Sequence, residues 1–170
     1  MSLQVILLIS FFSWLMAYAA ASDLVTMTIP NRLSIALLVG FVGFSVWFGM
    51  PLRDIGVHLL AGLVVLSVTF AMFAAGWIGG GDAKLAAATA VWCGFSDVLE
   101  YAILSSLLGG LLTVLLLLAR GLVLPQFMRQ WDWLMRLHDK KTGIPYGIAL
   151  AAAGLFVFPQ TALWVIAIAH

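Results

Sequence analysis

The chain has 170 residues, of which 64% are hydrophobic and only 9% are charged, and its formal net charge is +1 at pH 7. Soluble domains carry about 25% charged residues, so this chain lacks the polar surface that a soluble globule needs. The composition therefore predicts a polytopic membrane protein, and it provides no basic surface of the kind that binds nucleic acid.

Six apolar segments are candidates for membrane-spanning helices, since a helix of about 20 apolar residues crosses a bilayer core of about 30 Å. The first three contain no Asp, Glu, Lys or Arg and cover residues 3–21, 33–50 and 55–75. The last two cover residues 98–119 and 144–169, and Pro159 predicts a kink in the latter. We expect an all-α polytopic membrane protein with about six transmembrane helices, in which residues 1–170 form a single domain.

The fourth candidate segment is short, because Lys84 and Asp97 leave only residues 85–96 between them. Extending the segment back to Gly76 restores the length of a crossing. Asp82 would then lie below the membrane surface at a break in the helix, facing protein or water and not lipid. We keep this segment as a span, because without it the basic loop after residue 119 would lie on the outer side.

The loop between the fifth and sixth candidate spans, residues 120–143, carries an amphipathic pattern. Its apolar face comprises Leu124, Phe127, Met128, Trp131, Leu134, Met135 and His138, and its polar face comprises Arg129, Asp132, Arg136 and Lys140. The pattern is typical of an interfacial helix in the headgroup layer, with its basic residues near anionic lipid. Trp133 and Leu137 interrupt the polar face, so a helix packed partly on the bundle fits equally well.

The basic residues indicate how the spans are oriented. With six alternating spans, one side of the membrane carries seven of the eight basic residues, namely Arg32, Lys84, Arg120, Arg129, Arg136, Lys140 and Lys141. Only Arg53 lies on the other side. The positive-inside rule therefore places the amino terminus outside and the basic loops in the cytoplasm.

The sequence predicts no metal site and no cofactor. Cys93 is the single cysteine, which excludes an intrachain disulfide and a Cys-x-x-Cys site. His58, His138 and His170 are far apart in the sequence and share no helical spacing, so no cluster of metal ligands is visible. We expect all four side chains to be structural or interfacial.

Two of the seven carboxylates lack a simple structural explanation. Asp23 directly follows the first span, and Asp82 ends the segment Gly79-Gly80-Gly81-Asp82. The expected topology places both on the cytoplasmic side at similar depth. Two carboxyl groups close together at a membrane boundary favour sharing one proton, because burial and like charge both oppose double ionisation. Such a pair can take a proton from water and polarise a carbonyl, as aspartic peptidases do.

Further motifs accompany these two aspartates. Asp23 precedes the turn Ile29-Pro30-Asn31, Asp82 lies in Gly79-x-Gly81-Asp82-Ala83-Lys84-Leu85, and Gly143-Ile144-Pro145-Tyr146-Gly147 follows later. With these motifs the chain resembles the type IV prepilin peptidase family, whose members are GxGD aspartyl proteases of the membrane. The resemblance covers nearly the whole chain.

The resemblance implies an endopeptidase that removes the leader peptide of prepilins at the cytoplasmic face of the bacterial inner membrane, for pilus biogenesis. Asp23 and Asp82 match the catalytic positions, one activating water and the other assisting the scissile carbonyl. The supporting positions of the motifs are matched by Ile29, Pro30, Asn31, Gly79 and Gly81. Lys84 belongs either to the motif or to the basic anchors at span ends, and we prefer the anchor. The implied partners are a prepilin substrate and membrane lipid.

The chain departs from many bacterial members of this family. Those members carry an additional cytoplasmic amino-terminal domain with paired CxxC motifs and also methylate the new amino terminus of the pilin. This chain has neither the domain nor the cysteines, so we expect the compact, peptidase-only branch that is associated with tight-adherence Flp pili. Methyltransferase activity and bound zinc are not expected.

Two alternatives belong to other classes of protein. Intramembrane carboxylates at helix breaks also form proton or ion sites, so Asp23 and Asp82 could serve a coupled transporter. Their expected position toward one face of the membrane, away from the midplane, speaks against that function. In the second alternative the chain is a scaffold subunit whose aspartates are only paired or solvated.

Overall fold

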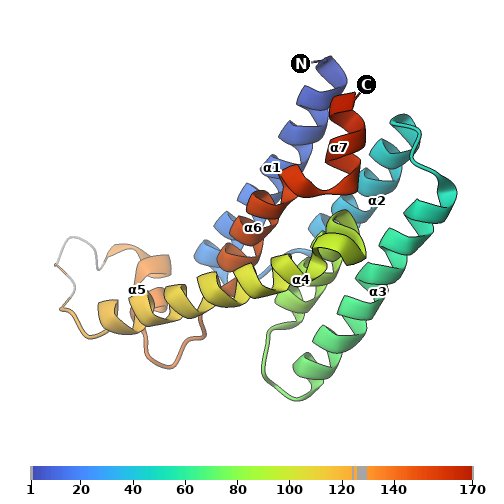
Figure 1. The fold of residues 1–170 in the computed structure, drawn as a ribbon. Helices are drawn as coiled ribbons and strands as arrows, with labels where there is room; N and C mark the ends of the chain where they lie inside the picture. The colour runs from blue at the N-terminus through green and yellow to red at the C-terminus, as the bar shows by residue number, and fades with distance from the viewer. Residues whose placement is uncertain (1, 124, 126–129, 170) are drawn as a thin grey trace.

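The computed structural model describes residues 2–123, 125 and 130–169, and this part of the chain contains helices and no strands (Figure 1). The all-α prediction is therefore confirmed. The apolar segments of the sequence form the long helices, and turns that contain glycine or proline separate them. In chain order the elements are α1 (Leu3–Thr26), α2 (Asn31–Trp47), α3 (Leu52–Ala74), α4 (Gly80–Ala119), α5 (Asp132–His138), α6 (Tyr146–Val157), the 3₁₀ helix η2 (Phe158–Gln160) and α7 (Ala162–Ala169).

The helices are those of a membrane protein. Among the described residues α1, α3 and α4 are long and apolar enough to cross a membrane, and α6 to η2 together with α7 form a possible fourth span bent by 45°. The bend lies at η2, which contains Pro159, so the predicted kink is confirmed. Helix α2 is also apolar, and its 17 residues are at the lower limit for a crossing.

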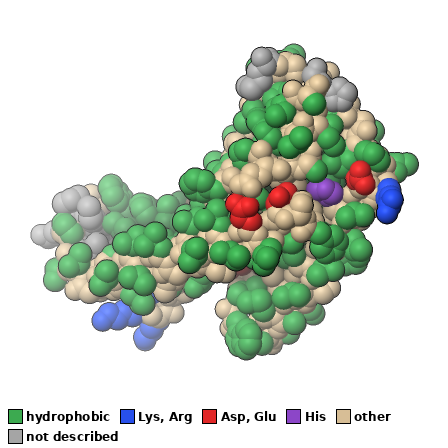
Figure 2. All heavy atoms as spheres, viewed as in Figure 1, with side chains coloured by type: hydrophobic (Ala, Val, Ile, Leu, Met, Phe, Trp, Pro, Cys, Tyr) green, Lys and Arg blue, Asp and Glu red, His purple; other side chains and the backbone are tan. Residues whose placement is uncertain are grey.

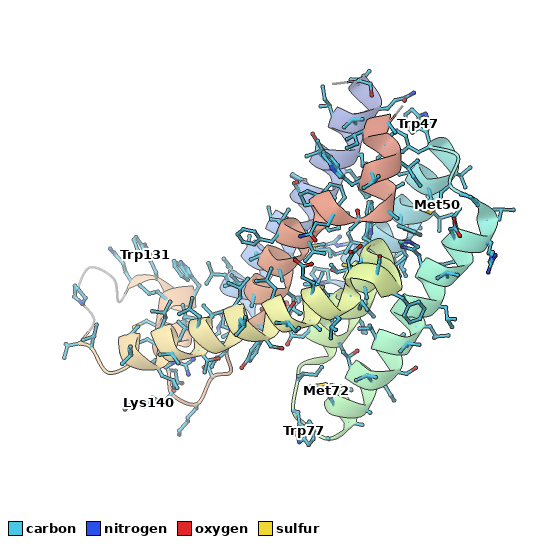
Figure 3. The ribbon with its side chains drawn as sticks, viewed as in Figure 1. Trp47, Met50, Met72, Trp77, Trp131 and Lys140 are labelled. Carbon is cyan, nitrogen blue, oxygen red and sulfur yellow. The ribbon has the colours of Figure 1, made fainter. Side chains whose placement is uncertain are left out.

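Exposed tryptophans mark the two ends of α3. Trp47 ends α2 shortly before α3 and is 54% exposed, and Trp77 follows α3 and is 75% exposed. Figure 3 shows these side chains near opposite ends of α3, and Figure 2 shows hydrophobic side chains over most of the visible face. Because tryptophan prefers the interfaces of a bilayer, this arrangement suits a helix that crosses the apolar layer.

Helix α4 changes direction at Gly94, whose φ of 65° and ψ of −174° lie outside the helical region. His58 of α3 packs against this break, and its Nδ1 lies 2.8 Å from the carbonyl oxygen of Val91. The sequence placed the boundary between the fourth and fifth spans near Asp97 because a charge marks it. The backbone instead breaks at the glycine, because only glycine adopts these angles without strain.

The first leg of α4 begins at Gly80, so the prediction that the fourth span extends back to Gly76 is wrong. Residues 75–79 form the turn from α3, and Gly76 has the left-handed φ of 75°. Asp82 consequently lies in the first turn of a helix and not at a break inside one. At 1.5 Å per residue this leg rises only about 20 Å, less than a bilayer core. Residues 85–94 are all buried, so other helices enclose the short leg.

Trp92, on the buried leg of α4, is the centre of the core. Its side chain is fully buried, and its Nε1 donates to the carbonyl oxygen of Leu37 on α2 at 3.1 Å. The rings of Phe12, Phe41 and Phe158 surround it, with centroids 4.8, 5.7 and 6.0 Å away. In a bilayer, apolar side chains contact lipid as favourably as they contact each other, so the hydrophobic effect does not hold helices together. Close packing around Trp92 therefore stabilises the association of α1, α2 and α4.

We expect Gly94→Ala to destabilise the fold by about 1–3 kcal/mol, the cost of a non-glycine residue in this backbone region. The added β-carbon would also lie 2.7 Å from Cε1 of His58. Thermal unfolding in detergent measures the change. Gly110→Ala in the same helix is the matched control, because no atom lies within 4 Å of its β-carbon position. Equal melting temperatures for the two variants would contradict the expected strain.

Hydrogen bonds tie the segment after α4 to the end of α4 and to the end of α1. The buried Arg120 donates through Nε to the carbonyl oxygen of Leu137 at 2.8 Å and through Nη2 to that of Gly143 at 2.9 Å. Arg136 of α5 donates to the carbonyl oxygen of Val25 near the end of α1 at 3.0 Å. Of the predicted loop helix, Asp132–His138 is helical and packs partly on the bundle. The predicted positions Leu124, Phe127, Met128 and Arg129 lie outside the described residues, as does His170.

Candidate active site

The two aspartates singled out by the sequence lie where three helices meet. Asp23 is in the last turn of α1, Asp82 is in the first turn of α4, and the start of α6 completes the site. Figure 1 shows the carboxyl end of α1 beside the beginning of α6. The segments that carry the two motifs are therefore neighbours in space although they are far apart in sequence.

Asp23 is buried, with 5% of its surface exposed, and it is held by the backbone of α6. Its Oδ2 accepts a hydrogen bond from the N–H of Gly147 at 2.7 Å. Gly147 is the second residue of α6, so its N–H has no acceptor within the helix. The carboxyl group thus provides an acceptor for an N–H at the amino terminus of α6, and this end of a helix favours a negative charge.

Asp82 is held by the amino terminus of its own helix. It is the third residue of α4, and its carboxyl group accepts a hydrogen bond from the N–H of Gly79, the N-cap residue. This contact is the reciprocal half of a capping box, in which the side chain at the third position reaches back to the cap. The rotamer of Asp82 is therefore tied to the start of α4.

The carboxyl groups of Asp23 and Asp82 are close enough to interact electrostatically. The structure thus brings together the two residues that the sequence predicted to converge. Like charges in a partly buried site favour a state in which the pair holds one proton. A pair in this state can accept a proton from water at one carboxylate and donate one to a substrate carbonyl from the other.

Ile29 fills the space between the two glycine motifs. Its side chain is buried, and it lies against both Gly81 and Gly147. A β-carbon at Gly81 would lie 3.2 Å from Cβ of Ile29, and one at Gly147 would lie 2.9 Å from Cδ1. The glycines are needed here because the loop that carries Ile29 passes directly over the starts of α4 and α6.

Asn31 and Lys84 link the remaining parts of the two motifs. Pro30 is the N-cap of α2, and Asn31 is its first residue. Nζ of Lys84 donates to Oδ1 of Asn31 at 2.9 Å. Lys84 therefore joins the start of α4 to the start of α2, while the exposure of its side chain also suits an anchor at the end of a span.

Gly147 is the site residue for which the sequence assigned no role. In the sequence it is only the last glycine of the Gly143–Gly147 segment. Its contribution is a backbone N–H, which cannot be recognised from the residue type. The available signal was a small residue in the first turn of a helix, directly after Pro145 and Tyr146. Tyr146 itself points to α4, where its hydroxyl lies 3.1 Å from Oγ1 of Thr113.

We expect Gly81→Val to impair the site, because the β-branched side chain would displace Ile29 and separate the starts of α4 and α6. For a site that acts through the Asp82 carboxyl group, the expected loss of rate is about 100-fold, as for misplacement of a catalytic group by about 1 Å. Turnover at matched membrane levels is the measurement. Gly56→Val is the control, since nothing lies within 4 Å of that β-carbon position. Full turnover by a folded Gly81→Val variant would contradict the role given to this glycine.

Comparison with known proteins gives consistent matches. The sequence model of the type IV leader peptidase family matches residues 10–114, which include both aspartates. The chain is 31% identical over 141 residues to a prepilin leader peptidase/N-methyltransferase of Xanthomonas campestris pv. campestris, covering 80% of this chain and 44% of that protein. It is 31% identical over 147 residues to the protein of the same name from Aeromonas salmonicida, covering 84% of this chain and 45% of that protein.

A third relative with this name, from Aeromonas hydrophila, is 30% identical over 147 residues. The chain spans less than half the length of these curated relatives, 44% and 45% of the first two. No solved structure gives a significant match.

Proposed function

Because the chain belongs to the type IV leader peptidase family, we propose that it is a membrane aspartyl endopeptidase that removes the leader peptide of prepilins. The observation that carries the proposal is the convergence of Asp23 and Asp82, each held by a backbone N–H at the start of a helix. The family assignment supports this function over the coupled transporter.

In the proposed reaction the two carboxyl groups share one proton. The ionised group takes a proton from a water molecule, whose oxygen attacks the carbonyl carbon of the scissile peptide. The protonated group hydrogen-bonds the carbonyl oxygen and supplies the proton that this oxygen needs as the tetrahedral intermediate forms. As the intermediate collapses and the C–N bond breaks, the group that took the water proton gives it to the leaving amine, and a hydroxyl proton of the intermediate passes to the other carboxylate. The pair then again holds one proton.

The position of the site fits a substrate with a basic leader and an apolar stem. Arg32 and Lys84 lie at the same end of the bundle as both aspartates, and Arg53 lies beyond the opposite end of α2. By the positive-inside rule we propose that the chain lies in the bacterial inner membrane with this end facing the cytoplasm, and that the amino terminus of α1 lies outside. The leader would then be cut at the surface while the apolar stem remains in the bilayer.

The experiment that tests the function is cleavage of a reconstituted prepilin by the purified chain in liposomes. A Flp-type prepilin is the first substrate, and mass spectrometry of the product measures leader removal. We expect a single cut before the apolar stem with wild type and none with the Asp23→Asn/Asp82→Asn double variant. Intact prepilins from several pilus systems after incubation with folded wild type would overturn the proposal, and proton flux without cleavage would favour the transporter.

A further inference from the structure

A pocket of about 420 Å³ lies between α1 and α2, away from the candidate active site. Its described lining consists of apolar and aromatic side chains and one basic side chain: Trp14, Leu15, Tyr18, Arg32, Leu33 and Ala36. Trp14 and Tyr18 are four residues apart on α1, and Arg32 and Ala36 are four residues apart on α2. Each pair therefore presents one helix face to the pocket.

The pocket faces away from the paired carboxyl groups. Trp14 precedes Asp23 by nine residues on the same helix, which at 100° per residue places them on opposite faces of α1. Asp23 points toward α6, as its hydrogen bond to Gly147 shows. The pocket is therefore a separate feature and not an extension of the candidate active site.

The aromatic wall of the pocket consists of two stacked rings and reaches away from the end of α1. The rings of Trp14 and Tyr18 are stacked almost in parallel, with centroids 5.7 Å apart and planes inclined by 4°. Tyr18 precedes the end of α1 by eight residues and Trp14 by twelve, so at 1.5 Å per residue they lie about 12 and 18 Å from that end. The wall thus extends from the interface toward the middle of the bundle.

Arg32 gives the pocket a polar end. It lies in the first turn of α2, is exposed, and has no hydrogen bond or ion pair with any of the described residues. No carboxylate is among the described residues that line the pocket. An arginine without a protein partner beside an apolar wall matches a ligand with one anionic end and one apolar chain. Guanidinium binds phosphate oxygens through two parallel hydrogen bonds, which a single ammonium group does not.

We propose that this pocket binds an anionic phospholipid, with its phosphate on the guanidinium of Arg32 and an acyl chain along Trp14 and Ala36. The polar end lies at the end of the helices and the apolar wall lies deeper, which is the order of headgroup and chain in a bilayer leaflet. The aromatic pair lies deeper than Arg32, at the depth of an acyl chain, and its ring faces offer apolar contact to that chain. The proposal is independent of the peptidase activity.

Native mass spectrometry of the intact chain in detergent tests the proposal, using phosphatidylglycerol and phosphatidylcholine with identical acyl chains. We expect wild type to retain phosphatidylglycerol preferentially. Arg32→Gln should lower that retention about five-fold, the factor given by about 1 kcal/mol for one basic residue near an anionic lipid. It should leave phosphatidylcholine nearly unchanged. Arg53→Gln, the same substitution at the opposite end of the bundle, should change neither lipid.

Two further arms make the outcome decisive. Trp14→Ala removes the apolar wall, so the retention of both lipids should fall. The side chain is 66% exposed, so its truncation removes little internal packing. Inorganic phosphate at millimolar concentration should not displace the lipid. Equal losses in Arg32→Gln and Arg53→Gln, unchanged retention in Trp14→Ala, or displacement by inorganic phosphate would each overturn the proposal.

Discussion

Asp23→Asn and Asp82→Asn are each expected to abolish leader removal while the protein still folds and inserts. Asparagine has nearly the same shape as aspartate, and its side-chain oxygen can still accept the hydrogen bond from Gly147 or Gly79. It can neither take a proton from water nor share one with the partner carboxyl group. General acid–base catalysis contributes about 10²–10⁴-fold, so each variant should lose at least that factor.

The measurement is the rate of leader removal at matched amounts of protein in liposomes. The double variant should be no slower than either single variant, because two groups that act as a unit do not contribute additively. Asp54→Asn is the matched control, since Asp54 is exposed in the first turn of α3 and distant from both motifs. Cleavage at the wild-type rate by either single variant would remove that aspartate from the mechanism.

Gly147→Ala is expected to slow leader removal by about 100-fold without changing a carboxyl group. The new β-carbon would lie 2.8 Å from Oδ2 of Asp23 and 2.9 Å from Cδ1 of Ile29, so the carboxyl group or α6 must move. Either movement lengthens the 2.7 Å hydrogen bond that fixes Asp23. Misplacing a catalytic group by about 1 Å costs about this factor in rate.

The control for this variant is Gly143→Ala, because nothing lies within 4 Å of the β-carbon position of Gly143. Both substitutions are made in the same short segment, and only the β-carbon added at Gly147 contacts Asp23 and Ile29. The rate constant should fall more than the apparent substrate affinity, since the defect is in the placement of Asp23. A Gly147→Ala variant that cuts as fast as Gly143→Ala would show that α6 does not position the aspartate.

The arrangement of helices was largely predictable, because long apolar segments bounded by Gly, Pro or charges leave few alternatives in a membrane. The convergence of Asp23 and Asp82 was predictable for the same reason, since alternating spans bring both to one side. The exact break in α4 was not. Asp97 marks a span end by its charge, whereas the backbone turns at Gly94, whose need for a positive φ is one of many possible reasons for a glycine.

The support of the site could not be read from the sequence either. Gly147 contributes a backbone N–H, which every residue except proline possesses, so its residue type shows only that there is no room for a side chain. The contact between Ile29 and two glycines depends on the path of a loop across the starts of two helices. The path of a loop cannot be predicted from hydrophobic periodicity or hydropathy.

The hydrogen bonds that hold Asp23 and Asp82 have a consequence for long-range attraction. Both donors are neutral backbone groups, and among the described residues no Lys or Arg forms an ion pair with either carboxyl group. The negative charge of the pair is therefore not cancelled by direct ion pairing, and its field acts locally at the site although Arg32 and Lys84 lie at the same end of the bundle. A positively charged leader would experience this field before contact, and mobile salt ions would shorten its range to about 8 Å at physiological ionic strength. Diffusional capture of the proposed substrate thus depends on the same geometry that keeps the carboxyl groups in place.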